Sequence, residues 1–402
     1  MKKTIFLLPG TKWQMDLART IRERGYNLYV ADPSENAPCR AYADKFLQSD
    51  IFDNKKIDAF IERNPIDAVV SDECDIATPV IARIGEKFHL ATIGSAEARL
   101  FTDKYKMKEF CRQIGLNYPE YRLCKTEEEV LLFLREIKKP IIIKPIDCNA
   151  SKGVHTVKSE QDIEKYFEET LSYSRIEKAV LAERYINGTE FTIDGIKTSE
   201  AHYTLAISEK KHFKHNCNIA DELLFSYSNE KFDYERLRNV NDLYILKSKL
   251  PFGLTHAEYK YENGKFYLIE IAARGGGNMI SSVISQYLSG YHTYEYLLDC
   301  ALGECAERTF EISGQLRDRV AVLKFFHTPH GGGRVKKIHG IDYLEKEADI
   351  KKYALNFSEG DIIGDCESDS ARIGYYIACS ETMEGLNAVM DHVEKKFRIE
   401  ME

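Results

Sequence analysis

Residues 254–273 constrain the fold of this chain more than any other segment. Two runs of alternating or apolar residues, 254–262 and 265–273, flank Asn263-Gly264, a dipeptide typical of tight β-turns. Side chains alternate between the two faces of a strand, so the turn decides which residues of the two strands share a face. The segment therefore predicts two adjacent antiparallel strands whose register depends on the turn.

Each predicted strand carries one glutamate, Glu258 on the first and Glu270 on the second. A two-residue turn pairs Glu258 with Ile269 and places Glu270 on the opposite face. A three-residue loop, with Gly264 in the left-handed position of a bulge, instead places His256 opposite Glu270 and Glu258 diagonal to it on the same face. Both loops suit the sequence, and both registers remain open.

Glu270 lies in the nearly apolar segment 267–273. A carboxylate in such a strand needs a partner if the strand is buried. Mg²⁺ suits this role, because it binds one or two carboxylates together with nucleotide phosphate oxygens. The alternative is a pair of solvated acids on an exposed sheet. Shared between two strands, the acids predict a magnesium site next to a nucleotide.

The bulk properties exclude several classes of protein. At 402 residues the chain predicts two or three domains, and with 44% hydrophobic and 30% charged residues it is typical of globular proteins. The net charge of −8 argues against a general nucleic-acid or anionic membrane surface. No apolar run approaches the roughly 20 residues of a membrane span. Ten scattered cysteines without a C-x-x-C pair indicate reduced thiols and a cytoplasmic location.

The N-terminal segment 1–98 alternates apolar strand-like runs with helical runs, and a short last strand is expected at 92–93. This alternation predicts a doubly wound parallel sheet. The loops at its strand ends would line a ligand crevice, which makes Lys12 and Glu73 candidates for holding a small polar substrate.

The rest of the chain predicts two further domains, so that the fold class is a multidomain mixture of α/β and α+β. The second domain spans 99–314 and includes a lid at about 115–185. Its segment 209–230 shows no clear periodicity and is expected to be a loop. The third domain, 315–402, is a small α+β unit with a glycine-rich flexible loop expected at 329–334.

Several polar residues stand out in the second domain. Lys144 ends a buried strand, so its ammonium needs an anion or a carbonyl unless it reaches water. Loop 147–153, which contains Ser151, Lys152 and Gly153, can fold over phosphates and bind them through backbone N–H groups. Glu190 can accept hydrogen bonds from ribose hydroxyls. Each of these signals is weak by itself.

In this order the residues resemble the ATP-grasp superfamily. The resemblance implies that Lys104 and Lys144 contact nucleotide phosphates and that Glu258 and Glu270 bind the metal. It implies further nucleotide contacts from the lid loop Ser151-Lys152-Gly153, from a hinge of the form E-x-Y-I at Glu183-Arg184-Tyr185-Ile186 that meets adenine, and from Glu190 at the ribose.

One departure from the family pattern concerns the second metal. Many members read E-x-N-P-R, whereas this chain reads Glu270-Ile-Ala-Ala-Arg274. The Ala-Ala-Arg form is most similar to the branch that holds L-amino-acid ligases and related carboxylate–amine ligases. Either Asn278 replaces the missing asparagine, or a second Mg²⁺ is held by phosphate and water alone.

The resemblance implies an ATP- and Mg²⁺-dependent ligase, for which Mn²⁺ can substitute. A carboxylate, from an amino acid or similar small acid, is activated as an acyl phosphate, and an amine then displaces phosphate, releasing ADP. Arg274 would stabilise the transferring phosphoryl group or the tetrahedral intermediate, above N–H donors of glycines 275–277. His256 can take the amine proton, or it can be packed beside the metal. A homodimer is one expected assembly.

Three other functions compete. An enzyme resembling phosphoribosylglycinamide synthetase would hold a substrate phosphate on a glycine-rich first turn, but the turn here, Pro9-Gly10-Thr11-Lys12, is poor in glycine. A biotin-carboxylase-like role is disfavoured because the chain lacks an A-M-K-M motif. A non-catalytic nucleotide-binding protein would have lost a metal acid or the arginine, and all are present.

Overall fold

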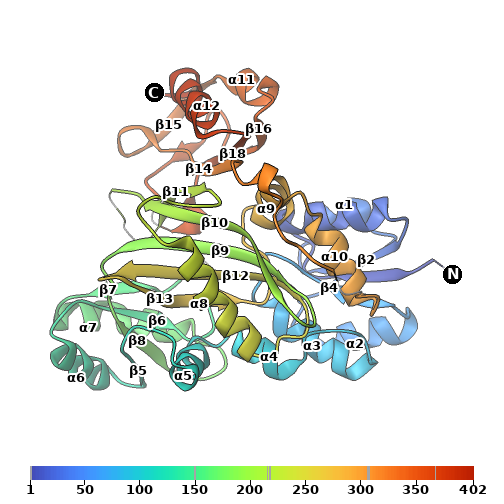
Figure 1. Cartoon of the computed structure of the whole chain (residues 1–402), viewed down its shortest axis with the longest axis horizontal. Helices are drawn as coiled ribbons and strands as arrows, with labels where there is room; N and C mark the ends of the chain where they lie inside the picture. The colour runs from blue at the N-terminus through green and yellow to red at the C-terminus, as the bar shows by residue number, and fades with distance from the viewer. Residues whose placement is uncertain (1, 149–150, 215, 217–218, 306–307, 367) are drawn as a thin grey trace.

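The computed structural model describes residues 2–148, 151–214, 216, 219–305, 308–366 and 368–402. It has a parallel N-terminal sheet, a small four-stranded sheet in the predicted lid, a large antiparallel sheet in the middle and a three-stranded sheet near the C-terminus (Figure 1). The mixed α/β multidomain class predicted from the sequence is confirmed. No described helix has the length and apolar character that crossing a membrane requires.

The N-terminal part is a parallel four-stranded sheet in the order β3-β2-β1-β4. Its elements are β1 (Thr4–Leu7), α1 (Met15–Glu23), β2 (Asn27–Asp32), β3 (Lys45–Gln48), α2 (Asn54–Arg63), β4 (Ala68–Val70) and α3 (Ala77–Phe88). The buried Ile5 and Leu7 pack with α1, whereas Phe6 packs with α2 and α3 on the other face. This alternation produces the doubly wound arrangement that the sequence predicted.

The expected strand at residues 92–93 is wrong, because this segment forms no strand. Thr92 instead packs against α3 at Gly85, where a Cβ would lie 2.2 Å from the Thr92 hydroxyl oxygen. The missing side chain of Gly85 thus allows the segment to follow the helix rather than the sheet edge.

The predicted lid contains a small antiparallel sheet in the order β5-β8-β6-β7. Its elements are β5 (Tyr121–Cys124), α6 (Glu127–Ile137), β6 (Ile141–Pro145), β7 (His155–Val157), α7 (Glu160–Ser172) and β8 (Val180–Arg184). Both helices pack on the same apolar cluster beneath the sheet, which includes Phe133 and Phe167. The opposite face of the lid sheet is therefore left for the polar side chains of β6 and β8.

The central sheet has eight antiparallel strands in the order β13-β12-β9-β10-β11-β14-β18-β16. Its strands are β9 (Thr189–Lys197), β10 (His202–His212), β11 (Ala220–Phe225), β12 (Gly253–Glu262), β13 (Lys265–Ala272), β14 (Val320–Phe325), β16 (Ile350–Leu355) and β18 (Gly374–Ser380). Helices α5 (Lys104–Ile114) and α8 (Tyr234–Lys247) pack on one face. The expected loop at 209–230 is wrong, since β10 and β11 occupy much of it. In β10, Lys210 and His212 lie on the face turned towards the site and Glu209 and Lys211 on the other face, so this part of the strand shows no apolar alternation.

The C-terminal strands β14, β18 and β16 extend this same sheet, so it crosses the boundary expected at 314. The domain limits 1–98, 99–314 and 315–402 therefore stay a prediction. The remaining elements after β13 are α9 (Ser285–Ser289), α10 (Thr293–Ala301), β15 (Gly333–His339), α11 (Ile341–Lys346), β17 (Ile362–Ile363), α12 (Met383–Lys396) and β19 (Arg398–Met401).

The segment expected as a flexible loop at 329–334 contains a 3-10 turn and the start of β15, while its flexibility stays a prediction. Gly332 has a φ of 96°, and a Cβ there would lie 2.2 Å from the carbonyl oxygen of Ile363. Glycine at this position therefore allows the backbone to adopt a positive φ and to lie close to β17.

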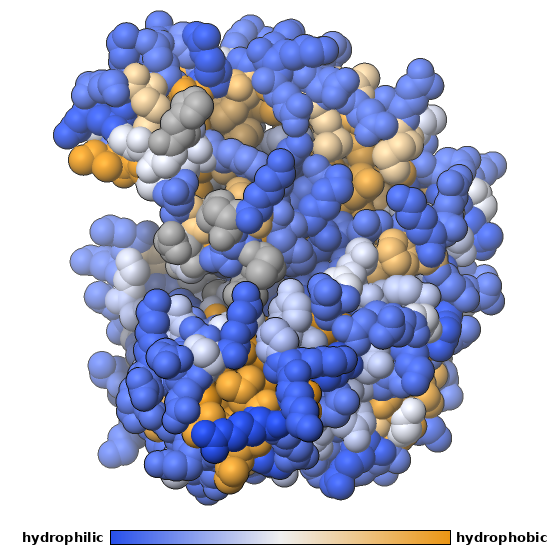
Figure 2. Space-filling model, turned by 90° about the vertical axis from the view of Figure 1, so that its left-hand side faces the viewer, coloured by the Kyte–Doolittle hydropathy of each residue, from blue (hydrophilic) through white to orange (hydrophobic). Residues whose placement is uncertain are grey.

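The surface seen from the lid side is mostly hydrophilic and is hollowed between its upper and lower parts (Figure 2). Exposed hydrophobic side chains in the predicted lid include Leu132 (58% exposed) and Ile176 (55% exposed). The polar residues described next come from the strands and loops around the central sheet.

Candidate active site

The turn of the hairpin joins β12 and β13 through two residues. Glu262 lies opposite Lys265, and Asn263 and Gly264 between them both have positive φ, of 50° and 78°. Positive φ at both positions is the type I′ geometry that Asn-Gly favours. The three-residue loop, and the register that it implied, are therefore wrong.

A bulge farther along the hairpin brings the two glutamates together. Tyr259 lies opposite Leu268, but the next pair is Glu258 opposite Glu270, so Ile269 is an extra residue on β13. The pairing of Glu258 with Ile269, expected for a two-residue turn, is wrong for the same reason. Directly opposite residues have Cβ atoms about 5 Å apart on one face. The shared face thus comes from the bulge at Ile269, which neither predicted register included.

Lys104 is bonded to one of these two acids. Its ammonium lies 2.8 Å from Glu270 Oε1 and donates to the carbonyl oxygen of Cys148 at 2.6 Å. Burial of Lys104 favours its neutral form, but Glu270 and Asp75 outweigh it and raise the pKa of Lys104 above its ordinary value. Lys104, at the start of α5 behind the N-cap Asp103, thus remains charged beside Glu270.

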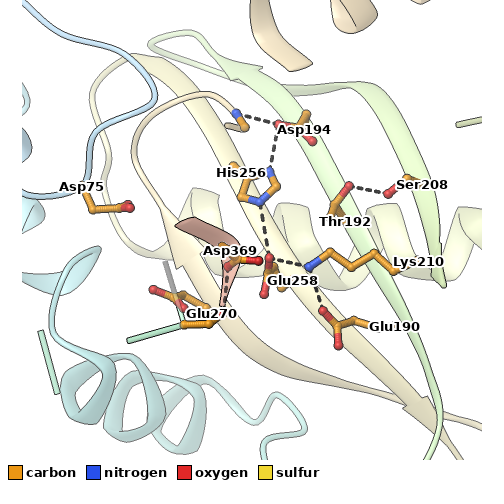
Figure 3. A network of polar contacts seen from close by, with 12 residues as sticks. Asp75, Glu190, Thr192, Asp194, Ser208, Lys210, His256, Glu258, Glu270 and Asp369 are labelled. Atoms are coloured by element: carbon orange, nitrogen blue, oxygen red, sulfur yellow. Dashed lines mark hydrogen bonds and ion pairs between the residues drawn. The ribbon is translucent and has the colours of Figure 1, made fainter. Parts of the chain in front are cut away.

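A lysine that the sequence analysis did not single out bonds the other acid. Lys210 on β10 contacts both Glu258 Oε1 and Glu190 Oε1 at 2.7 Å (Figure 3). Burial by itself would raise the pKa of Glu258, but Lys210 and His256 hold that pKa well below its usual range. Glu190 lies 3.3 Å from the Nε2 atom of His212, and Lys210 likewise lowers its pKa against the effect of burial.

Lys144 meets an acid from the neighbouring lid strand. Its ammonium lies 2.8 Å from Glu183 Oε2, and a second, fully buried lysine, Lys108, lies 3.4 Å from Glu183 Oε1. Lys108 also donates to the carbonyl oxygens of Leu268 and Ile269 at 2.6 and 2.8 Å. It therefore fixes the bulge from the side of α5. Burial lowers the pKa of Lys108 to about 8, although Glu183 opposes this.

His256 bridges two carboxylates on the same sheet face. Its Nδ1 atom lies 2.9 Å from Asp194 Oδ1, and its Nε2 atom lies 3.8 Å from Glu258 Oε1 (Figure 3). Burial favours neutral imidazole, but Asp194 outweighs it and raises the pKa of His256 to about 9. Asp194 thus favours the charged imidazolium, and both expected roles of His256, as a base for the amine proton and as a residue packed beside the metal, stay predictions.

Arg274 forms a two-bond contact with the N-terminal part. Its Nε and Nη2 atoms donate to Asp75 Oδ1 and Oδ2, each at 2.8 Å, and Nη1 donates to the carbonyl oxygen of Gly275 at 2.7 Å. Asp75 keeps the planar guanidinium in one orientation. Although burial opposes it, Asp75 raises the pKa of Arg274. An arginine held this way is a fixed positive charge beside the predicted metal acids.

The glycine segment is bonded differently from the prediction. The N–H of Gly275 donates to Asp72 Oδ1 at 2.6 Å, and that of Gly276 donates to Asp194 Oδ1 at 2.9 Å. Two of the three expected N–H donors are thus engaged inside the protein, which corrects the expectation that they face the reaction centre. A Cβ at Gly277 would meet nothing within 4 Å, so open space remains only there in this segment.

The lid loop lies close to the C-terminal part. Ser151 donates to Asp369 Oδ2 at 2.9 Å, Lys152 is exposed, and Gly153 is buried with a φ of 68°. Their predicted phosphate contacts stay a prediction. Residues 149–150 of this loop lie outside the described residues.

The predicted hinge comprises the last two residues of β8 and the two residues that follow it. The backbone N–H of Tyr185 donates to the carbonyl oxygen of Pro140 at 3.0 Å, the ammonium of Lys260 lies 4.9 Å from its ring centre, and Ile186 is 2% exposed. Asn278 has a left-handed φ of 57° on the loop after Arg274. The adenine contacts of the hinge and the metal contact of Asn278 also stay predictions.

The acids fit Mg²⁺ bound together with a nucleotide. The described residues contain no group of three or more His, Cys, Asp or Glu side chains that could hold a metal by themselves. Mg²⁺ seldom uses such a cage and needs only one or two carboxylates when phosphates complete its shell. Glu258 and Glu270 are the predicted carboxylates for such a site, and Lys104 and Lys144 are the predicted cations for the phosphates.

Sequence reasoning missed five polar residues of this network, which are Asp72, Asp75, Lys108, Asp194 and Lys210. A usable signal was period-two polarity, because polar side chains on one sheet face recur at every second residue. The residues on that face are Glu190, Thr192 and Asp194 on β9, Ser208, Lys210 and His212 on β10, and His256, Glu258 and Lys260 on β12. Lys210 and Asp194 follow this rule. Lys108, Asp72 and Asp75 do not, since their roles depend on contacts between distant segments.

Comparisons with known proteins agree with this geometry. Residues 137–283 match the model of an ATP-grasp domain, and residues 325–402 match that of L-amino acid ligase C-terminal domain 2. A formate-dependent phosphoribosylglycinamide formyltransferase of Methanococcus maripaludis is 29% identical over 202 residues, which are 49% of this chain and 52% of that relative. One from Chlorobaculum tepidum is 28% identical over 197 residues, 48% of this chain and 50% of that relative. The aligned region thus spans about half the length of these relatives.

Among solved structures, L-amino acid ligase from Bacillus licheniformis has a TM-score of 0.82 at 19% identity, covering 100% of this chain and 99% of that chain. Phosphoribosylglycinamide synthetase from Anaerococcus prevotii has a TM-score of 0.75 at 19% identity and covers 100% of both chains. At these identities the likeness concerns the fold alone. The matched models show that residues 137–283 are an ATP-grasp domain, the domain type of enzymes that use ATP with Mg²⁺, and that residues 325–402 are a C-terminal domain of the L-amino acid ligase type.

Proposed function

We propose that this chain joins the carboxylate of an amino acid, or of a similar small acid, to an amine and releases ADP and phosphate. The observation that carries the proposal is the placement of Glu258 directly opposite Glu270, next to Lys104 and Arg274. Two facing carboxylates suit a metal, and fixed cations suit a phosphoryl group in transfer. The match of residues 325–402 to an L-amino acid ligase domain supports an amino acid as substrate.

The residues of the chain act mainly by positioning and by neutralising charge. When bound, ATP supplies the phosphoryl group that activates the acid. Lys104 and Lys144 hold phosphate oxygens, Glu258 and Glu270 hold the metal, and Arg274 meets the charge that develops during transfer. The two-bond contact with Asp75 keeps Arg274 oriented, so little reorganisation is needed during the reaction.

A ligase acting on phosphoribosylglycinamide is the second candidate, because the sequence relatives carry that substrate in their names. A phosphate-bearing substrate needs cations or free N–H groups at the crevice of the N-terminal sheet. The loop after β4 is acidic instead, with Asp72, Glu73 and Asp75. Burial and the neighbouring Asp72 raise the pKa of Glu73 well above its usual value, which already indicates crowded negative charge. This environment favours the amino-acid reading.

Location and assembly form part of the proposal. None of the nine described cysteines forms a disulfide, which supports a reducing compartment such as the cytoplasm. The partners are small-molecule acids and amines, and the assembly is proposed to be a homodimer. Sedimentation of the purified chain tests the dimer directly, and a monomer at micromolar concentration would contradict it.

The decisive experiment measures phosphate release from Mg-ATP with pairs of amino acids and identifies the products by mass spectrometry. We expect ADP, phosphate and a condensed product for some pairs. Phosphoribosylglycinamide with formate is the parallel arm for the second candidate. Turnover in that arm alone would replace the amino-acid proposal, and turnover in neither arm would contradict both.

A further inference from the structure

Asp194 occupies a central place in the polar network without a role in any step described so far. It lies on β9, is 2% exposed, and shares a sheet face with Glu190. Its Oδ1 atom accepts two hydrogen bonds, from His256 Nδ1 and from the N–H of Gly276, both at 2.9 Å (Figure 3). One buried oxygen therefore connects a side chain of β12 with the backbone that follows β13.

The contact with Gly276 is close enough to require glycine. A Cβ at that position would lie 2.5 Å from Asp194 Oδ1 and 2.9 Å from His256 Nδ1. Real side chains essentially never approach so closely, so the backbone at Gly276 rests directly on the Asp194–His256 pair. This backbone lies between Arg274 and the open space at Gly277.

The other side of His256 faces the metal acid. Its Nε2 atom lies 3.8 Å from Glu258 Oε1, whose position Lys210 also restrains at 2.7 Å. A carboxylate that holds one imidazole nitrogen fixes the tautomer and the ring orientation, and thereby what the second nitrogen presents. Asp194 thus controls a contact to Glu258 that it does not make itself.

We propose that Asp194 is a positioning residue that couples the metal acid Glu258, through His256, to the backbone at Gly276 beside Arg274. The metal and the phosphoryl-binding segment then keep one relative placement during the reaction. This inference rests on the proposed ligase function, since it assigns a purpose to the coupling. The coupling itself concerns contacts that are present without nucleotide.

Two substitutions and one control test it. Asp194→Ala removes both hydrogen bonds, whereas Asp194→Asn keeps the shape but loses the charge. Glu209→Gln is the control, because Glu209 lies on the opposite face of the neighbouring strand β10 and contacts Asn229 instead of the site. Each protein is examined by amide exchange of peptides covering 273–280 without nucleotide, by Mn²⁺ binding in paramagnetic resonance with ATP absent and present, and by steady-state kinetics.

In Asp194→Ala we expect exchange at Gly276 to quicken roughly tenfold or more, since its acceptor is lost, with exchange elsewhere unchanged. Both Asp194 variants should lower kcat roughly ten- to hundredfold, because displaced groups miss the transition state, while KM for ATP changes roughly threefold or less. Mn²⁺ should bind more weakly in both. Glu209→Gln should match the parent in all three measurements.

Unchanged exchange at Gly276 in Asp194→Ala, or unchanged kcat and Mn²⁺ affinity in Asp194→Asn, would overturn the proposal. If Asp194→Ala does not fold, the folded Asn variant decides through its kcat-to-KM pattern and its Mn²⁺ affinity. Amide exchange and Mn²⁺ binding need no acid or amine substrate. An inactive parent protein would therefore refute the proposed function without touching this test of Asp194.

Discussion

Glu258 lies directly opposite Glu270 because Ile269 is an extra residue on β13. Each acid is bonded to a lysine from a different element, Glu270 to Lys104 of α5 and Glu258 to Lys210 of β10. Each lysine thus places a positive charge beside one acid, and Lys210 lowers the pKa of Glu258 against the effect of burial, which suits the two acids to their predicted role as metal ligands.

Replacing either acid by its amide tests the metal site. We expect Glu258→Gln and Glu270→Gln each to lower Mg²⁺-dependent ADP formation roughly hundredfold or more, because a bound metal supplies several kcal/mol of charge stabilisation. Glu209→Gln is the control, since Glu209 lies on the opposite face of β10 and contacts Asn229. Turnover close to that of the control in both variants would remove the acids from the metal site.

Lys108 should matter for stability as well as for the site. Lys108→Met leaves the carbonyl oxygens of Leu268 and Ile269 without this donor and removes one of two cations from Glu183. We expect it to lower the free energy of unfolding by about 3 kcal/mol in urea titrations. Lys106→Met, on the same helix, should change it by about 0.5 kcal/mol or less. Equal stability of the two variants would show that the bulge does not depend on Lys108.

Local patterns predicted most of the helices and strands and the acids of the hairpin. The helical runs expected within segment 1–98 include α3, whose buried residues lie on one face over the length of the helix. The strands β10 and β11 were missed because both faces of β10 are polar over residues 208–212, where the expected loop began. Such a strand lacks the apolar alternation on which the prediction depends.

The relation between the two metal acids was beyond sequence reasoning for a different reason. A bulge shifts the register by one residue, and no local residue pattern at Ile269 predicts the bulge. Its stabilising donor, Lys108, comes from a helix 160 residues earlier in the chain. Asp75 is likewise 199 residues from Arg274. Spacing cannot reveal such contacts before the fold is known.

The pH dependence of stability should report on His256. Its pKa is about 9 in the folded protein, where Asp194 outweighs burial, against about 6.5 when unfolded. A raised pKa contributes stability that is complete below about pH 6.5 and is lost as the pH rises through about 9. The parent protein should thus exceed His256→Gln in unfolding free energy by about 3 kcal/mol more at pH 6 than at pH 10. The substitution His392→Gln at an exposed histidine is the control. A difference in unfolding free energy between the parent and His256→Gln that does not change with pH would contradict the pairing of His256 with Asp194.

The lid loop should respond to nucleotide. Backbone N–H groups at 151–153 are expected to bond phosphates, so their amide exchange should slow when Mg-ATP is added. Hydrogen exchange measured by mass spectrometry checks this, with the buried strand β1 as internal reference. Equal exchange with and without Mg-ATP would place the phosphates elsewhere.

Arg274 provides the most direct test of the reaction class. If a phosphoryl group is transferred to the acid, Arg274 faces more negative charge in the transition state than in bound ATP. Arg274→Ala should therefore lower kcat roughly hundredfold or more, which corresponds to a loss of about 3 kcal/mol of transition-state stabilisation, while nucleotide affinity changes little.

Arg274→Lys should recover little of this loss, because a single ammonium cannot keep both bonds to Asp75 and meet phosphoryl oxygens as well. Asp75→Asn, which weakens the same contact from the other side, should lower kcat in the same direction. The products should be ADP and phosphate throughout, because attack falls on the terminal phosphorus. Detection of AMP and pyrophosphate with the correct substrate pair would refute this mechanism, since none of the roles given to Arg274 and the metal acids leads to that cleavage.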